Sequence, residues 1–194
     1  MIDSPSSIIL LSLRVALVCT TLGIVPAVAT GYVLHRIRSA SVRTVLSTIV
    51  LLPLALPPVV TGLVLLRLFG RGGPFAGLDL PFTEGAAVVA ALVVSFPLLT
   101  IGSRAAFEAV DDRFREVSGT LGAAPWRTFL QVTLPLAWPG ILGAAVLAWA
   151  RSLGEFGATI VLAGNIPGKT QTIAAAVYTL LESPTPHPAM NTLL

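Results

Sequence analysis

Four apolar runs, each long enough to cross a bilayer, set the limits on how this chain folds. They cover residues 8–34, 45–68, 86–107 and 141–162. A membrane-spanning helix needs about 20 apolar residues, and only helices and closed barrels satisfy the backbone within lipid. Helix-length runs therefore predict an all-α integral membrane protein with about four full spans. The charged fraction of 11%, against about 25% in soluble domains, agrees with this prediction.

The arginines between the runs predict an orientation. The loop after the first run holds Arg36, Arg38 and Arg43, and Arg104, Arg113, Arg115 and Arg127 follow the third run. Because Lys and Arg concentrate in cytoplasmic loops, both segments are expected in the cytoplasm. The N-terminus and residues 69–85 and 163–170 are then expected outside. The net charge of +3 is accordingly explained by loop arginines that set the orientation of the spans in the membrane, and we expect no nucleic-acid binding.

Residues 108–136 form the one long polar segment between two spans. We expect a first helix with Glu116 in its early turns and an end at Gly122, because glycine suits the left-handed residue that closes a helix. Pro125 then fits the first position of a second helix, where its missing N–H costs nothing. Pro135 is expected to end that second helix.

The spacing of Glu116, Gly122 and the ending Val132-Thr133-Leu134-Pro135 resembles the EAA loop of ABC-importer permeases. Val117 and Ser118 depart from the Ala-Ala that the family favours after the glutamate. The resemblance implies a cytoplasmic element that couples to a separate ATPase subunit, so that ATP is not a cofactor of this chain. The coupling residues it implies are Glu116, Gly122, Phe129, Val132, Leu134 and Pro135. The alternative is an ordinary cytoplasmic hairpin between two spans.

The fourth run carries charges that lipid disfavours. A charged side chain at the bilayer centre costs roughly 2.5–3.5 kcal/mol on insertion scales. Arg151 and Glu155 are four residues apart, so they share a helix face and are expected to pair. Ser152 and Thr159 extend that face, and Gly154 and Gly157 permit close helix approach. These polar residues predict part of a translocation path, or alternatively an ion pair that only fixes packing.

Prolines cluster in the second run at Pro53, Pro57 and Pro58. Each removes a backbone donor, which lipid tolerates where neighbouring helices or water compensate. We therefore expect a bent helix, with Pro57 and Pro58 lining the path. The alternative is a kink that serves packing alone.

Several stretches resemble the molybdate importer permeases. They are ARSLGEFGAT at 150–159, AGNIPGKTQT at 163–172, AVYTLLES at 176–183 and LPLALPP at 52–58. The resemblance implies a type I ABC importer permease-like helical bundle in the bacterial plasma (inner) membrane, with residues 1–194 as one transmembrane domain. The partners it implies are a second permease copy in a homodimer, cytoplasmic ABC ATPase subunits and an extracytoplasmic oxyanion-binding protein.

The C-terminal part is too short for a fifth span. Residues 171–183 are expected to form a short helix at the outer surface, followed by a proline-broken loop. Related permeases have one more span and end in the cytoplasm. We expect that this final span is missing and that residues 191–194 begin it.

Other functions are disfavoured by particular residues. Residues 163–170 fit a relaxed phosphate-binding loop, but Ala163 replaces the first glycine and Pro167 removes an amide. Cys19 stands alone, and His35 and His187 are far apart in sequence, so no metal site or other cofactor is expected. No paired His or carboxylate residues indicate an enzyme. Sulfate, thiosulfate and tungstate remain alternative cargoes, and an ATP-independent carrier remains an alternative mechanism.

Overall fold

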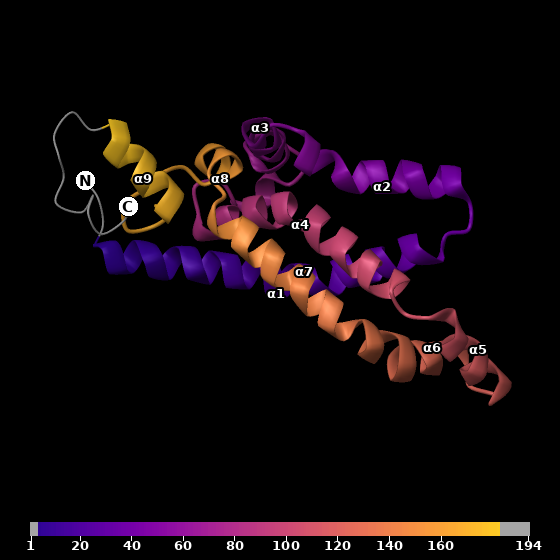
Figure 1. Ribbon diagram of the computed structural model, residues 1–194. Helices are drawn as coiled ribbons and strands as arrows, with labels where there is room; N and C mark the ends of the chain where they lie inside the picture. The colour runs from indigo at the N-terminus through magenta and orange to yellow at the C-terminus, as the bar shows by residue number, and fades with distance from the viewer. Residues whose placement is uncertain (1–3, 183–194) are drawn as a thin grey trace. The chain divides into compact units, whose positions relative to one another are not determined.

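The computed structural model describes residues 4–182, and all regular secondary structure in that range is helical, with no strand (Figure 1). The all-α expectation is thus confirmed. In chain order the elements are α1 Pro5–Arg36, α2 Ala40–Ala55, α3 Pro58–Phe69, η1 Ala76–Leu78, α4 Glu84–Glu108, α5 Asp112–Thr120, α6 Pro125–Thr128, the π-helical η2 Phe129–Thr133, α7 Leu134–Leu153, α8 Gly157–Leu162 and α9 Ile173–Glu182. The expected loop at 183–190 and helix start at 191–194 lie outside the described residues.

Three helical stretches are long and apolar enough to cross a membrane, namely Pro5–Arg36, Glu84–Glu108 and Pro125–Leu153. A fourth is the pair α2 and α3, whose axes bend by 102° at the break between them. The second predicted run is therefore bent, as its prolines indicate, and the break falls at residues 56–57. The expected short helix near the C-terminus is also present as α9.

The fourth predicted span is wrong at both ends. The sequence predicts a helix over 141–162 that follows a stop at Pro135, whereas the helix is continuous from Pro125 to Leu153. Proline disrupts a helix because its ring crowds the carbonyl four residues earlier. For Pro135 that carbonyl belongs to Gln131, inside the π-helical turn η2, where Leu134 N–H bonds to Phe129 O. The wider turn accommodates the ring. At the other end, residues 154–156 interrupt the helix.

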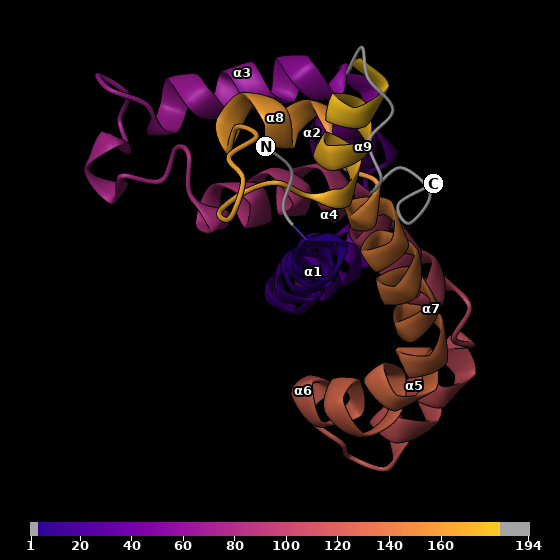
Figure 2. The ribbon, with the colours of Figure 1, turned by 90° about the vertical axis from the view of Figure 1, so that its left-hand side faces the viewer.

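Described by itself, the first of two compact units includes, within the described range, residues 4–22, 52–95 and 149–182. Its core is rich in alanine and includes Val15 and Cys19 of α1, Leu65 of α3, Ala91 of α4 and Leu162 of α8. Small residues let membrane helices approach closely. At Gly62 of α3, an added Cβ would lie 2.9 Å from the Cα of Ala158 in α8. Figure 2 shows α3 lying along α8.

The second unit comprises residues 23–51 and 96–148. Its core joins Ala27 of α1 and Leu99 of α4 to Ala144 of α7, with a neighbouring cluster around Phe107 and Ile141. Small residues again set the helix spacing, since a Cβ at Gly102 would lie 2.4 Å from that of Ala144.

Candidate functional site

The polar segment folds into a helical hairpin of α5 and α6, which we call the coupling hairpin (residues 112–128). Asp111 begins α5 as its N-cap by accepting a hydrogen bond from Arg113 N at 2.9 Å. Gly122 follows the end of α5 with φ +77°, a conformation that favours glycine, and Pro125 opens α6. The predicted helix end and helix start are therefore confirmed. Glu116 lies on α5 with its side chain exposed.

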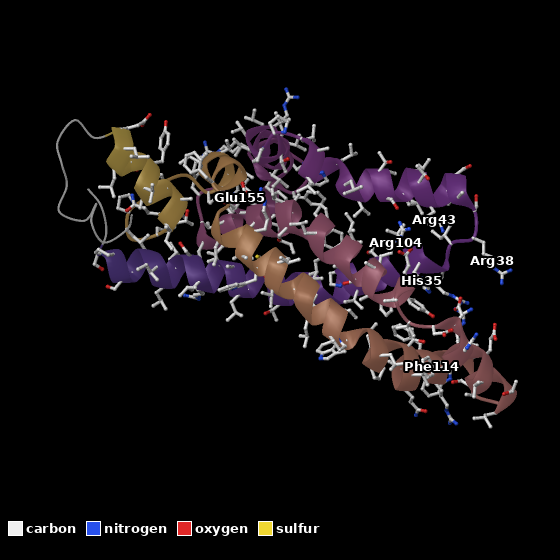
Figure 3. The ribbon with its side chains drawn as sticks, in the orientation of Figure 1. His35, Arg38, Arg43, Arg104, Phe114 and Glu155 are labelled. Carbon is white, nitrogen blue, oxygen red and sulfur yellow. The ribbon has the colours of Figure 1, made fainter. Side chains whose placement is uncertain are left out.

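Large apolar side chains are exposed on this hairpin. The exposed fractions are 52% for Phe114, 58% for Val117, 81% for Leu121, 61% for Trp126 and 51% for Leu130 just after it. Figure 3 labels Phe114 on α5. Large apolar side chains exposed on a polar, non-membrane segment are typical of interaction surfaces. None of these side chains is predicted from the sequence as a site residue. Large apolar residues in an otherwise polar hairpin are nevertheless a signal that could have indicated an exposed interaction surface.

Phe129 does not belong to that exposed surface. Its ring packs against Tyr32 of α1, with centroids 4.4 Å apart, and lies 6.1 Å from the ring of Phe107 on α4. Leu134 packs on the same cluster, Val132 is half-buried and Pro135 is exposed. The structure therefore places Phe129 and Leu134 where the hairpin joins the helices of its unit.

Arg151 and Glu155 meet at the break between α7 and α8, where Figure 3 labels Glu155. Arg151 Nη1 lies 2.9 Å from Glu155 Oε2, which confirms the predicted pair. The other carboxylate oxygen of Glu155 accepts a hydrogen bond from Ala158 N at 2.9 Å, in the first turn of α8. The Glu155 side chain is 2% exposed and that of Arg151 is 31% exposed. One carboxylate thus neutralises a cation and satisfies a helix N-terminus that the break leaves without partners.

The remaining predicted path residues lie in the same unit. Ser152 donates to Trp149 O at 2.7 Å, and Thr159 is buried in α8. Pro57 lies in the break before α3 and Pro58 is the first residue of α3, and a Cβ at Gly157 would meet that of Pro58 at 2.7 Å. Gly157 thus permits the predicted close approach, whereas Gly154 has only the Arg151 carbonyl within 4 Å of its Cβ position. The two helix breaks therefore adjoin.

The segment after α8, residues 163–172, is a turn held by hydrogen bonds among its own residues. Ile166 N donates to Thr170 Oγ1 at 3.1 Å, and Thr170 N donates to Ile166 O at 2.9 Å. Asn165 bridges Gln171 and Thr179 through its side chain. Amides engaged in this way do not form a phosphate cradle. Over residues 4–182, no group of three His, Cys, Asp or Glu side chains suits a metal ion.

Comparison with known proteins places the chain in a family. Residues 20–183 match the model of the binding-protein-dependent transport system inner membrane component. The molybdenum transport system permease protein ModB of Escherichia coli K12 is 48% identical over 149 residues, which cover 73% of this chain and 65% of that protein. The chain thus spans just under two thirds of that relative. The ModB of Haemophilus influenzae is 40% identical over 185 residues, covering 92% and 80% respectively.

A solved structure supports the fold. An inward-facing form of the MetNI methionine ABC transporter matches with a TM-score of 0.76 and 21% identity, covering 97% of this chain and 85% of that one. Its similarity confirms the expected permease-like helical bundle and carries no statement about cargo. With three span-length helices, a bent pair and a family match over most of its length, the chain belongs to the binding-protein-dependent transport system inner membrane components.

Proposed function

We propose that this chain is the transmembrane permease subunit of an ATP-driven molybdate importer. The observation that carries the proposal is 40% identity to a molybdenum transport permease across four fifths of that protein's length. The stretch at 150–159, one of those whose resemblance to molybdate permeases first suggests this cargo, contains the α7–α8 break at residues 154–156. ATP hydrolysis is assigned to a separate subunit.

The coupling hairpin is proposed to dock on that cytoplasmic ATPase. Its exposed Leu121 and Trp126 supply an apolar contact, and Glu116 and Gly122 shape the turn. Phe129, Val132, Leu134 and Pro135 connect the hairpin to α7. Since the Phe129 ring packs on Tyr32 and Phe107, a displacement of the hairpin reaches α1 and α4 through direct contact.

The adjoining helix breaks are proposed to border the translocation path. Discontinuous helices with polar residues are typical of substrate routes in transporters. Arg151 supplies positive potential for an oxyanion, and Glu155 limits it, so that the cargo is attracted without being retained. Ser152, Thr159, Pro57 and Pro58 complete the border.

The orientation is proposed from charge, with the coupling hairpin in the cytoplasm and the N-terminus outside. Cysteines at Leu121 and Leu78, which are 81% and 66% exposed, report the two sides. A membrane-impermeant maleimide added to intact cells should label Leu78→Cys and leave Leu121→Cys unlabelled. The native Cys19 is buried and gives little background. The reverse labelling pattern would overturn both the orientation and the coupling role.

The assembly is proposed to be a homodimer served by an extracytoplasmic oxyanion-binding protein. The cargo is tested by uptake of radioactive molybdate in cells that lack their own molybdate permease and express this chain with a candidate ATPase subunit and a candidate oxyanion-binding protein from the same organism. Excess tungstate should compete and excess sulfate should not. Deleting the ATPase gene should abolish uptake. Uptake that persists without the ATPase would indicate a secondary carrier, and competition by sulfate or thiosulfate alone would reassign the cargo.

A further inference from the structure

A pocket of about 1320 Å³ opens where α3 ends. Its walls come from α3, the loop to α4 and the turn after α8, all within the first unit. Neither the coupling hairpin nor the proposed path uses this pocket. For comparison, sites for drug-sized ligands occupy about 300–1,000 Å³, so the pocket is far larger than a tetrahedral oxyanion requires.

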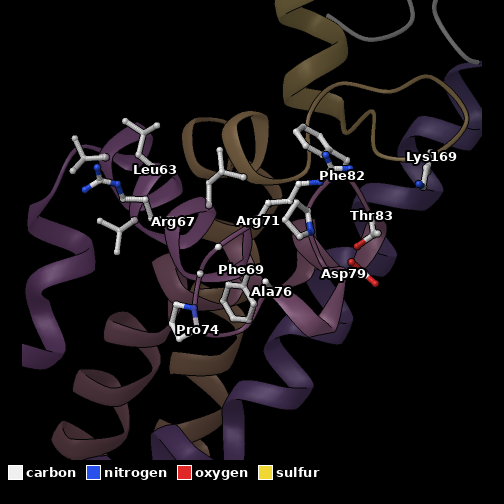
Figure 4. A pocket seen from close by; sticks show the side chains of 17 residues that line it. Leu63, Arg67, Phe69, Arg71, Pro74, Ala76, Asp79, Phe82, Thr83 and Lys169 are labelled. Atoms are coloured by element: carbon white, nitrogen blue, oxygen red, sulfur yellow. The ribbon is translucent and has the colours of Figure 1, made fainter.

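The charges on the pocket are predominantly positive. Arg67 of α3, Arg71 of the following loop and Lys169 of the turn after α8 line it, and Asp79 is the one carboxylate among the lining residues. Figure 4 shows Arg67 toward one end of the view and Lys169 toward the other, with Arg71 and Asp79 between them. All three cations are exposed, and none makes an ion pair with a residue of the described range.

The part of the pocket wall that α3 contributes is mainly apolar. Val60, Leu63 and Val64 of α3 line it and are 38%, 52% and 49% exposed. They lie on a helix whose other face is closed against α8 through Gly62. The pocket therefore joins a cationic rim at the end of a membrane helix to an apolar face of that helix.

The loop that forms the rim is held in place. A Cβ at Gly73 would lie within 2.5 Å of the carbonyl oxygens of Arg67 and Leu68, so the loop backbone sits directly on the end of α3. Farther along, Phe82 N donates to Leu162 O at 3.0 Å. Phe82 itself has φ +63°, which is strained for a bulky residue. Such strain persists only where the surroundings fix it, so the rim is preformed.

We propose that this pocket binds an anionic glycerophospholipid, with its phosphate among Arg67, Arg71 and Lys169 and its acyl chains along α3. Lipid binding strengthens with buried apolar area and with electrostatic attraction to anionic headgroups, and the three cations, which make no ion pair with a described residue, offer the positive charge that such a headgroup requires. The size and apolar wall favour a lipid over a free oxyanion of the same charge. The proposal does not rest on molybdate transport, only on the chain lying in a membrane.

The test is binding of dioctanoyl-phosphatidylglycerol to the purified full chain in neutral detergent, measured as mass adducts by native mass spectrometry. Each of Arg67→Gln, Arg71→Gln and Lys169→Gln should raise the apparent Kd roughly fivefold, from the usual contribution of one cation near an anionic surface. The triple variant should lose on the order of 100-fold. Arg71→Lys should retain binding, because it keeps the charge. Dioctanoyl-phosphatidylcholine should bind much more weakly than phosphatidylglycerol.

The matched control is Arg38→Gln, which removes an exposed arginine between α1 and α2 that makes no ion pair with a described residue. It should leave the Kd unchanged. Equal loss in this control, equal affinity for phosphatidylcholine, or binding by the triple variant within twofold of the parent would each overturn the proposal. Binding of molybdate in place of phosphatidylglycerol would reassign the pocket to a free oxyanion. A failed uptake assay alone would leave the lipid site standing.

Discussion

The packing of α3 on α8 can be tested by adding one methyl group at Gly62. An alanine Cβ there would lie 2.9 Å from Ala158 Cα, 2.9 Å from Ala158 O and 2.9 Å from Val161 Cβ. Two of these atoms belong to the backbone and cannot rotate away. Overpacking of this kind costs about 1–3 kcal/mol. Replacing a helical glycine by alanine also gains up to about 1 kcal/mol in helix propensity, so a matched control is needed.

Gly143 in α7 supplies that control. Apart from its chain neighbours and the adjacent backbone of its own helix, a Cβ there has no atom within 4 Å, so Gly143→Ala gains the propensity without the clash. The difference between the two variants isolates the packing term of about 1–3 kcal/mol. At about 2–4 °C per kcal/mol for a chain of this size, the apparent Tm of Gly62→Ala should be about 2–12 °C below that of Gly143→Ala.

The measurement is the thermal loss of the monodisperse peak in size-exclusion chromatography, with both variants in the same detergent and at the same heating rate. Lower stability of Gly62→Ala supports direct contact between the helices that follow the two breaks. An apparent Tm of Gly62→Ala equal to or above that of Gly143→Ala would refute the packing.

Two further substitutions test the coupling hairpin and the ion pair. Gly122→Val should lower molybdate uptake at unchanged membrane abundance, because φ +77° disfavours a β-branched residue and an added Cβ meets no neighbouring atom, so that only the turn is strained. Gly119→Val within α5 is the control. Equal uptake by the two variants would contradict the role of the turn. Glu155→Ala removes the contacts to Arg151 and Ala158 and should cost up to about 3–5 kcal/mol, whereas Glu155→Gln keeps an acceptor for Ala158 N–H and should cost less. Equal apparent Tm values for the two Glu155 variants would exclude the capping role.

Local chemistry made the coupling hairpin predictable. Gly122 and Pro125 each impose a backbone conformation that depends little on distant contacts, and both boundaries fall where the sequence places them. The Arg151–Glu155 pair was predicted from the spacing of a shared helix face, but Glu155 lies in the break after α7 and reaches Arg151 from there. The bend of the second span followed from its prolines, although its angle did not.

The helix through Pro135 and the break after Leu153 were not predictable from hydropathy. Apolar runs report burial in lipid and do not report whether the backbone is continuous. Pro135 is accommodated by a π-helical turn that no composition rule indicates. A signal for the break did exist, because two poor helix formers, Gly154 and Gly157, flank an acidic residue that reaches the first turn of α8. The resemblance counts Phe129 among the coupling residues, and its packing on Tyr32 and Phe107 could not be predicted because it depends on residues far away in sequence.

The break at residues 154–156 gives the Glu155 carboxylate a second structural role. An uninterrupted helix would leave its carboxylate with one task, to balance Arg151 in an apolar setting. At the break it also accepts the hydrogen bond of Ala158 N–H, a donor that would otherwise lack a partner within lipid. The charge pair and the helix break therefore stabilise each other, because removal of the carboxylate deprives both the Arg151 guanidinium and the Ala158 N–H of this partner. A passing oxyanion would meet the partly exposed Arg151 with its charge already balanced, which favours brief association over tight binding. A membrane carboxylate is thereby compatible with an anion path beside it.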